Sequence, residues 1–442
     1  MAPRMFAYSL SGFFGSLARF RVEAAILLAV RATVVLSGGL VFALACGDAG
    51  LSAGSGSFAG SGGQASGATF SSGSSHGLSG LASGASVGTG GSASGASVGT
   101  AGSASGSSVG TSGSVGSTAE TGSGGLPTVG GIFQQPEPWT EDVTGLPKDA
   151  RSDAIIAALA TMGGWGNGNQ FQIDFSIPVF FGDTTTPRQT ISAQAGSQYC
   201  YGGPDCDAVP MQMPLPANGN TEGSASYTCD TTGTTAGQGD CHVLVVEKDQ
   251  NKLYELYNST RTATGFTALG AFIWDLTKAY PKNLRGDQCT SADAAGFPMA
   301  ALLPTADEVA AGAVKHALRF ILPNDRMRPR AYVHPASHAG SPKGPNSNAP
   351  PYGVRFRLKA AFDETPFSAG AKVILRALKT YGMLLSDGGN IALTFADDRT
   401  TTAKWAAQGI TSRTFAAIGV NSFEVVDYSP EVPLTDNCMR NP

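Results

Sequence analysis

The chain has 442 residues, with 29 Lys and Arg against 33 Asp and Glu, so its formal net charge is −4. This mildly acidic balance argues against a nucleic-acid-binding protein, which needs a basic surface. Charged residues make up 14% of the chain and 59 residues are Gly. Residues 47–125 hold 25 of these Gly and two charges, Asp48 and Glu120. Residues 126–442 are long enough for one large domain or two small ones.

Residues 1–45 have the order of a secretory signal peptide. Four arginines precede an apolar run that ends at Cys46: Arg4, Arg19, Arg21 and Arg31. A basic start, an apolar stretch of about 14 residues and small residues before the cleavage point are typical of export signals. The run is shorter than the roughly 20 apolar residues of a transmembrane helix. We therefore predict a signal peptide over 1–45, with an uncleaved anchor as the alternative.

Cys46 stands in a segment that resembles the lipobox of bacterial lipoproteins, Ala43-Leu44-Ala45-Cys46-Gly47. In that family the cysteine becomes the first mature residue and carries the lipid, although Ala43 stands where leucine is preferred. The resemblance implies lipidation of Cys46, a membrane as partner, and a place in the cell envelope on the outer membrane or cell surface. An ordinary signal peptide with an unmodified Cys46 is the alternative.

Residues 46–125 read as a flexible tether behind this anchor. Positions 82–114 contain three copies of an 11-residue repeat of the form ASG[AS]SVGT[GAS]GS. An 11-residue period can indicate a helical coil, but Gly and Ser form helices poorly and the repeat has no apolar stripe. One Val in each repeat cannot form a core. The segment is predicted to be a linker with a span of roughly 50 Å.

Six cysteines follow the linker: Cys200, Cys206, Cys229, Cys241, Cys289 and Cys438. An even number in an exported chain predicts three disulfides, for which 15 pairings are possible. Short spacing favours Cys200–Cys206 and Cys229–Cys241, which leaves Cys289–Cys438. No CxxC pair occurs, so metal binding by cysteine is not expected.

Residues 126–442 are predicted to be a single domain that is mainly β with a few helices. Helices are expected over 147–162, 307–313 and 369–381, where apolar residues recur at helical spacing. Strands are expected over 170–181, 242–247, 252–257, 272–276, 317–322, 332–334, 354–362, 383–386, 391–395 and 423–427. Turn-forming residues predict hairpins at 248–251 and 387–390. Many short strands with few helices favour a β-sandwich, with a jelly roll as one form.

Several runs in this domain are familiar: TSADAAG at 290–296, ADEVAAG at 306–312, HALRF at 316–320, PPYG at 350–353 and ALKTYGM at 377–383. Together they resemble an uncharacterised family of secreted bacterial proteins and cover most of 150–438. No activity is known for that family, so the resemblance implies an extracytoplasmic domain and assigns no catalytic residue.

The candidate catalytic residues are two of the scarce histidines, two acids and a tyrosine: His316, His338, Asp293, Asp275 and Tyr381. Asp293 lies at an element end, and Asp275 lies beside a Trp on a predicted strand. A histidine or tyrosine can act as a general base, and two carboxylates across a cleft can hydrolyse a glycoside. Glu308 and Asp387 also lie at element ends, although Asp387 fits a turn, and His242 reads as structural. The spacing of His334 and His338 would favour metal binding only on a helix, which Pro335 opposes.

A basic row along 354–359 is the candidate binding surface. Arg355, Arg357 and Lys359 alternate with apolar residues and therefore share one face of a strand. With Arg319 and Tyr332 nearby they could bind an anionic polysaccharide such as a polyuronate. An ordinary solvated face of an antiparallel sheet is the alternative.

The sequence therefore predicts an exported, lipid-anchored and monomeric surface protein. Its leading function is that of a carbohydrate-active enzyme, either a glycoside hydrolase or a polysaccharide lyase. The alternatives are a module that binds glycan or a surface partner without catalysis, and a purely structural envelope lipoprotein. The chain has no GxSxG in its folded part, no phosphate-binding loop and no dinucleotide-binding glycine pattern. No cofactor and no metal site are expected, and EF-hand spacing is absent around Asp205 and Asp207.

Overall fold

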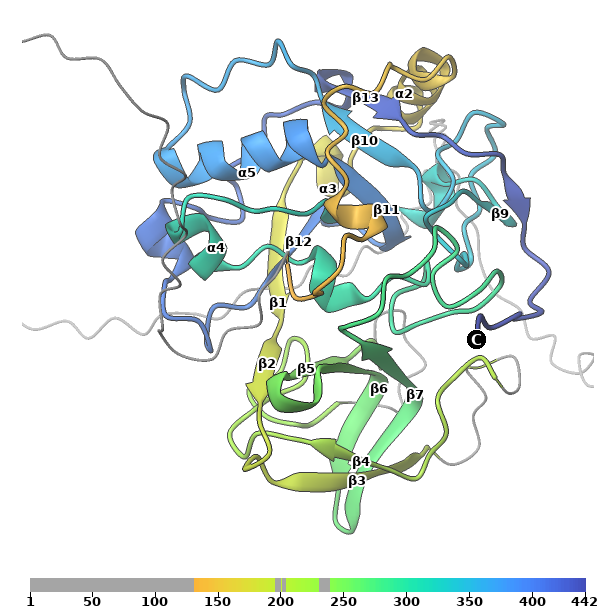
Figure 1. Ribbon diagram of the computed structural model, residues 1–442. Helices are drawn as coiled ribbons and strands as arrows, with labels where there is room; N and C mark the ends of the chain where they lie inside the picture. Colours follow the sequence, from red (N-terminus) through yellow and green to blue (C-terminus); the bar gives the residue numbers. More distant parts are fainter. Residues whose placement is uncertain (1–130, 195–199, 201–203, 230–238) are drawn as a thin grey trace, which may run out of the picture. The chain divides into compact units, whose positions relative to one another are not determined.

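The computed structural model of the protein describes residues 131–194, 200, 204–229 and 239–442 (Figure 1). All of these fall in one unit of contacts, residues 112–442. The expected signal peptide, Cys46 and the repeat-containing linker lie outside the described residues. Within the described part, no helix has both the length and the apolar character needed to cross a membrane.

Six strands form the first sheet, in the order β1-β12-β8-β11-β10-β13. Their bounds are β1 Ile173–Ile177, β8 Leu318–Leu322, β10 Arg355–Leu358, β11 Met383–Gly388, β12 Leu393–Ala396 and β13 Phe423–Val426. The sheet is mixed, because β1 and β12 run parallel, as do β8 and β11, while the other neighbours are antiparallel. Strand β8 is central, with β12 on one side and β11 on the other.

The second sheet also has six strands, in the order β2-β5-β6-β7-β3-β4. Their bounds are β2 Val179–Gly182, β3 Arg188–Ala193, β4 Met211–Pro214, β5 His242–Glu247, β6 Lys252–Thr262 and β7 Gly265–Asp275. The long antiparallel run β5-β6-β7 forms its middle (Figure 1). A separate two-stranded ribbon pairs β9 Ala331–Tyr332 with β14 Val432–Pro433.

The α-helices among the described residues are α2 Ser152–Thr161, α3 Gly166–Asn169, α4 Ala306–Ala310 and α5 Ala369–Thr380. Helix α5 packs against β10, and α2 packs against β13 (Figure 1). Ser368 caps α5 by accepting a hydrogen bond from the Ala371 N–H, which satisfies one of the free donors of its first turn. The fold is thus mainly β with few helices, as predicted.

Two details of the predicted strands are wrong. The expected strand 170–181 is broken at Pro178 into β1 and β2, which belong to different sheets. Pro has no N–H to donate to a ladder, so it marks the point where the chain passes from one sheet to the other. The segments around 387–390 are not a hairpin, because β8 lies between β11 and β12.

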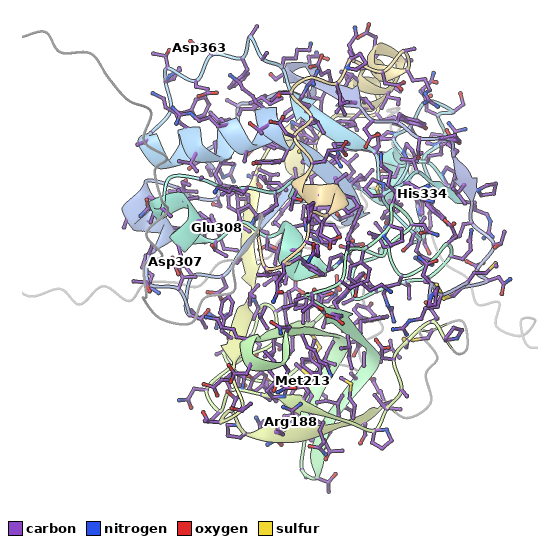
Figure 2. All side chains as sticks on the ribbon, viewed as in Figure 1. Arg188, Met213, Asp307, Glu308, His334 and Asp363 are labelled. Carbon is purple, nitrogen blue, oxygen red and sulfur yellow. A yellow bond between two sulfur atoms is a disulfide. The ribbon has the colours of Figure 1, made fainter. Side chains whose placement is uncertain are left out.

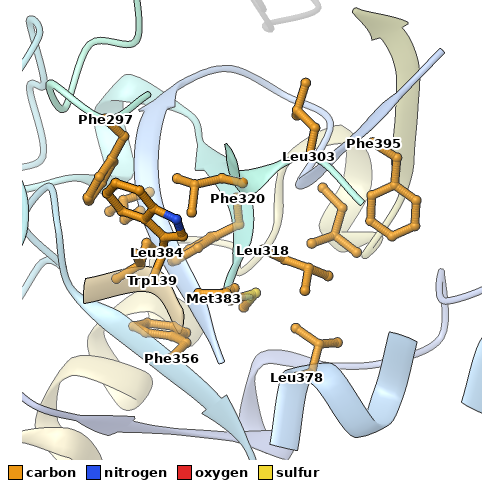
Figure 3. Close-up of a cluster of buried hydrophobic side chains, with 14 of the residues drawn as sticks. Trp139, Phe297, Leu303, Leu318, Phe320, Phe356, Leu378, Met383, Leu384 and Phe395 are labelled. Atoms are coloured by element: carbon orange, nitrogen blue, oxygen red, sulfur yellow. The ribbon is translucent and has the colours of Figure 1, made fainter. Parts of the chain in front are cut away.

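One hydrophobic core extends from the first sheet to one face of the second. Side chains alternate along β5, so Leu244 and Val246 join the large core while Val243 and Val245 join a smaller cluster on the opposite face. The first sheet contributes the large side chains, and Figure 3 shows Leu378 of α5 facing this cluster of buried side chains. Both faces of β5 are therefore buried.

The three predicted disulfides are present: Cys200–Cys206, Cys229–Cys241 and Cys289–Cys438. The first two close short loops, whereas Cys289–Cys438 joins positions 149 residues apart. This last bond links the segment after β7 to the C-terminal tail.

Removal of the Cys289–Cys438 bond should cost more stability than removal of a local bond. Replacing both cysteines with Ala is expected to lower the free energy of unfolding by about 5 kcal/mol, because the closed loop is long. The Cys200–Cys206 bond closes a loop of only 6 residues. Replacing these two cysteines with Ala should therefore cost about 2 kcal/mol. Urea denaturation of both double variants measures the difference, and equal losses would contradict the loop-length argument.

Candidate functional site

A cavity of about 450 Å³ among the described residues is lined by several ionisable side chains. Its charged and polar lining comes from separate segments: Asp240, Tyr257, Arg330, His338, Asp387 and Asp436. Cavities of this size suit small molecules or a few units of a polymer. With Arg330 as its one cationic lining residue among those described, the cavity is acidic.

Asp387 is held at this cavity by a buried cation, Arg319, on the central strand β8. The Arg319 guanidinium reaches both neighbouring strands: Nη2 donates to Asp387 Oδ2 on β11 at 2.8 Å, and Nη1 donates to Thr394 Oγ1 on β12 at 2.9 Å. The register of β11 against β8 shifts between Leu385 and Asp387. Such irregularities re-aim side chains, and Asp387 lines the cavity while its Oδ2 accepts from Arg319 on β8.

Asp293 is the third partner of this cation. Arg319 Nε donates to Asp293 Oδ1 at 2.8 Å, and Asp293 Oδ2 has no hydrogen-bond partner among the described residues. Burial raises the pKa of Asp293 to about 7; Arg319 opposes this rise and Asp387 adds to it. The turn after Asp293 requires Gly296, whose φ is +86° and whose Cβ would lie 2.1 Å from Ser337 Oγ.

A second titratable group lies where β5 begins. The buried His242 places Nδ1 2.5 Å from Glu222 Oε2 and Nε2 3.0 Å from the Ala292 carbonyl oxygen. The Glu222 N–H donates to the His242 carbonyl at 3.0 Å, so the turn that carries Glu222 is fixed against β5. Asp240, two residues before His242, faces the cavity, and Ala292 lines it as well.

The environment shifts the pKa values of these groups. Asp240 is open to the cavity, but the surrounding walls remove much of its hydration, and this burial together with Glu222 and Asp387 raises its pKa to about 6. Burial alone would lower the pKa of His242, but the Glu222 carboxylate outweighs it and the pKa rises to about 9. Burial raises the pKa of Tyr257 to about 12 and lowers that of His338.

Among the residues that the structure describes, two groups of side chains have metal-ligand chemistry. Glu222, Asp240 and His242 place one ligand atom each within 4.8 Å of one another. Asp205 lies similarly close to Cys289 and Cys438, but those sulfurs form a disulfide and cannot ligate as thiolates. The first group is therefore the candidate for a metal.

Three sequence-predicted site residues belong to this region. His338 lines the cavity, and its Nδ1 lies 2.8 Å from the Ala294 carbonyl oxygen. Asp293 and Arg319 lie behind the wall, where they fix Asp387. The predicted surface role of Arg319 becomes a buried structural contact to a cavity carboxylate.

His316 lies elsewhere and is engaged with a helix cap. It is buried, with Nε2 3.3 Å from Glu308 Oε1 and Nδ1 2.8 Å from the Ala317 carbonyl oxygen. Glu308, labelled in Figure 2, also forms a capping box with Thr305 at the start of α4. The His316 imidazole therefore stabilises the N-terminal end of α4 through Glu308.

The other predicted residues are dispersed. Asp275 ends β7, accepts hydrogen bonds from Thr277 and borders a separate cavity of about 400 Å³. Tyr381 follows α5 and packs on the core. Tyr332 is fully buried and donates to Asp287 Oδ1 at 2.9 Å.

The basic row of β10 already has partners within the chain. Arg355 is fully buried and Nη2 donates to the Pro138 carbonyl at 2.6 Å. Arg357 Nη2 donates to Glu424 Oε1 at 2.7 Å, and Lys359 donates to a backbone carbonyl. The segment before α2 covers this face, so these cations are not arranged as an open anion-binding row.

Sequence reasoning missed four ionisable residues that line the cavity and Glu222 beside them: Asp240, Tyr257, Arg330 and Asp436. It favoured a turn for Asp387 and a structural role for His242. None of these residues belongs to a recognisable spacing pattern. One feature of the predicted hairpin does point to the site. His242 and Tyr257 are directly opposite each other in β5 and β6, so their side chains lie on the same face of the sheet.

Comparisons with models of protein families, with curated proteins and with solved structures find no match to this chain.

Loss of the buried cation should be strongly destabilising. Arg319→Met leaves Asp293 buried without its counter-charge and is expected to cost about 3–5 kcal/mol of unfolding free energy. Adding Asp293→Asn should recover part of that loss. Lys282→Met, which breaks an exposed pair with Asp427, should cost less than about 1 kcal/mol. Urea denaturation tests the series, and a loss at Arg319 as small as at Lys282 would refute it.

The His316–Glu308 pair predicts a pH dependence of stability. Glu308 raises the pKa of His316 above 6.5 against the effect of burial, and His316 lowers the pKa of Glu308 below 4.5. The His316 contribution is complete below pH 6.5 and is lost as pH rises through the folded-state pKa. The Glu308 contribution is present above pH 4.5 and is lost as pH falls. The stability difference between wild type and Glu308→Gln should therefore be largest from pH 4.5 to 6.5, and a constant difference would contradict the pair.

Proposed function

We propose that this protein is exported, held at the cell envelope through a lipidated Cys46, and hydrolyses extracellular polysaccharide in the acidic cavity. Three disulfides suit an oxidising compartment. The leader, the lipobox-like segment and the linker support anchoring at a surface with reach beyond it. We also propose that the two sheets stack as layers of a sandwich, since β5 contributes to the core of the first sheet.

The charge of the cavity favours hydrolysis over elimination. Asp240, Asp387 and Asp436 face it, while Arg330 lies 3.4 Å from Asp436 and is partly neutralised by it. A polyuronate brings further carboxylates and would be repelled by such a lining. Hydrolysis of a neutral glycan, in contrast, uses carboxyl groups on either side of the bond that breaks.

Asp387 is the carboxylate assigned to the attack. Arg319 Nη2 and the Gly388 N–H fix its two oxygens at 2.8 and 2.7 Å. An ionised, fixed carboxylate can take a proton from water or attack the sugar carbon itself. Asp240 and Asp436 are the other cavity carboxyl groups that could give a proton to the departing oxygen. Asp387 held by a buried Arg319 at a carboxyl-lined cavity is the observation that carries this proposal.

The full chain with its disulfides formed should release reducing ends from a neutral polysaccharide in a panel of neutral and uronate polymers. Asp387→Asn should lower the rate by about 100-fold or more, the range expected for loss of a general base. Asp275→Asn changes an acid at the other cavity and should leave the rate within about twofold, because its carboxylate only caps a turn.

Unsaturated uronate, read as ultraviolet absorbance, would contradict hydrolysis and favour elimination. Binding to the panel without any release of reducing ends would favour the non-catalytic glycan-binding module. The thermal midpoint of each variant, measured in parallel, separates lost chemistry from lost fold.

A further inference from the structure

The start of β5 brings together an imidazole and two carboxylates from distant turns. Glu222 Oε2 lies 2.5 Å from His242 Nδ1, and Asp240 completes a set in which the three ligand atoms lie within 4.8 Å of one another. His242 is 3% exposed, so its ring is held by packing and cannot turn away. The imidazole is therefore preorganised, while Glu222 is half-buried and Asp240 is exposed.

The contacts of His242 fix which ring nitrogen carries hydrogen. The Ala292 carbonyl can only accept, so Nε2, at 3.0 Å from it, must be the N–H. A neutral imidazole then has a bare lone pair at Nδ1, and that lone pair faces the Glu222 carboxylate, a second acceptor. Two acceptors that face each other need a positive charge at that point, and the 2.5 Å separation fits a proton on Nδ1. A metal ion can replace that proton once the two atoms move apart to roughly 3 Å, as metal–ligand bonds of about 2 Å require.

The outer contacts resemble those that orient metal ligands. A metal-binding histidine commonly donates its other N–H to a backbone carbonyl or a carboxylate, and Ala292 supplies such a carbonyl. The second oxygen of Glu222 is 3.2 Å from the Ser176 hydroxyl, which also contacts Asp174 at 2.8 Å. Glu222 is thus oriented from behind, with Oε2 left for the ligand set.

The negative charge around His242 also favours a divalent metal ion over a single proton. Glu222 and Asp240 lie beside the His242 imidazole, and Asp174 shares the Ser176 hydroxyl with Glu222. A singly charged imidazolium leaves this group with excess negative charge, whereas a divalent ion balances two carboxylates. Asp240 lines the cavity, which provides an entry path and space for a water or substrate oxygen on the ion.

We infer that Glu222, Asp240 and His242 form a binding site for one divalent transition-metal ion, best suited to Zn²⁺. Imidazole nitrogen and carboxylate oxygen are both zinc ligands, and three protein ligands with a fourth position open toward a cavity are the arrangement of a catalytic-type zinc site. Ca²⁺ prefers six to eight oxygen ligands, so the imidazole selects against it. On binding, Nδ1 coordinates through its lone pair and the proton it carried passes to solvent. The site does not depend on the proposed hydrolysis.

The test is calorimetric titration of ZnCl₂ into the chelator-treated full chain with its disulfides formed. One Zn²⁺ should bind per chain, and it should raise the thermal midpoint. His242→Gln and the nearly isosteric Glu222→Gln should each weaken binding by at least about 100-fold, since second-shell changes alone cost about 10–100-fold. Glu222→Gln keeps the side-chain volume, so it preserves the test if the buried His242 position does not tolerate change.

His334→Gln is the matched control, because His334 Nε2 also lies against a carboxylate, Asp287 Oδ1 at 2.9 Å, but outside this group. Its Zn²⁺ affinity should equal that of wild type. Binding of Co²⁺ should add a visible absorption band that is present in wild type and His334→Gln and lost in Glu222→Gln. Absence of saturable binding, or equal binding by wild type and Glu222→Gln, would overturn the site. Zn²⁺ binding is measured without substrate. A failure to bind Zn²⁺ therefore leaves the hydrolysis proposal intact, and a failure to hydrolyse polysaccharide leaves the metal site intact.

Discussion

The buried positive charge of Arg319 is the constraint around which the interior is arranged. A guanidinium does not lose its proton in a protein, so the charge can be accommodated away from water only if carboxylates and oxygens meet it in the right geometry. The structure meets that demand from three directions, with Asp387 on β11, Thr394 on β12 and Asp293 on the loop after β7. The order of strands places Thr394 and Asp387 on either side of Arg319. The turn at Gly296 follows Asp293, the third contact of Arg319.

The second sheet contacts the region around Arg319 because the side chains of β5 alternate between its two faces. Because successive side chains of β5 point to opposite faces, Val243 and Val245 hold the sheet against its own small core, while Leu244 and Val246 join the large one. His242 has the parity of the latter pair and therefore points toward the loop that bears Asp293. Its hydrogen bond to the Ala292 carbonyl joins the second sheet to the loop whose next residue, Asp293, accepts from Arg319 of the first sheet. The acidic cavity lies at this connection.

Local sequence patterns predicted most individual helices, strands and turns correctly, but they could not predict which strands lie side by side. The hairpin of β5 and β6 follows from its turn residues, and Asn251 adopts the left-handed conformation that such a turn favours. The same reasoning failed for β11 and β12, because a turn signal cannot show that β8, from another part of the chain, lies between them. Asp293 and Arg319 were noticed as scarce charges, but their meeting with Asp387, Asp240 and Glu222 depends on contacts between segments up to about a hundred residues apart. A single sequence carries no record of such contacts.

The Cys289–Cys438 bond has a meaning beyond chain entropy. It ties the loop that contributes Ala292 and Ala294 to the tail that contributes Leu434 and Asp436, and all four residues line the acidic cavity. Two walls of the cavity are thus joined by a link that forms only where thiols are oxidised. A newly made chain in a reducing compartment would hold the buried charges of the sheets but lack the covalent closure of the cavity around them. Covalent closure of the cavity is thereby coupled to the oxidation of two thiols, and a chain that keeps them reduced lacks this link between the two walls.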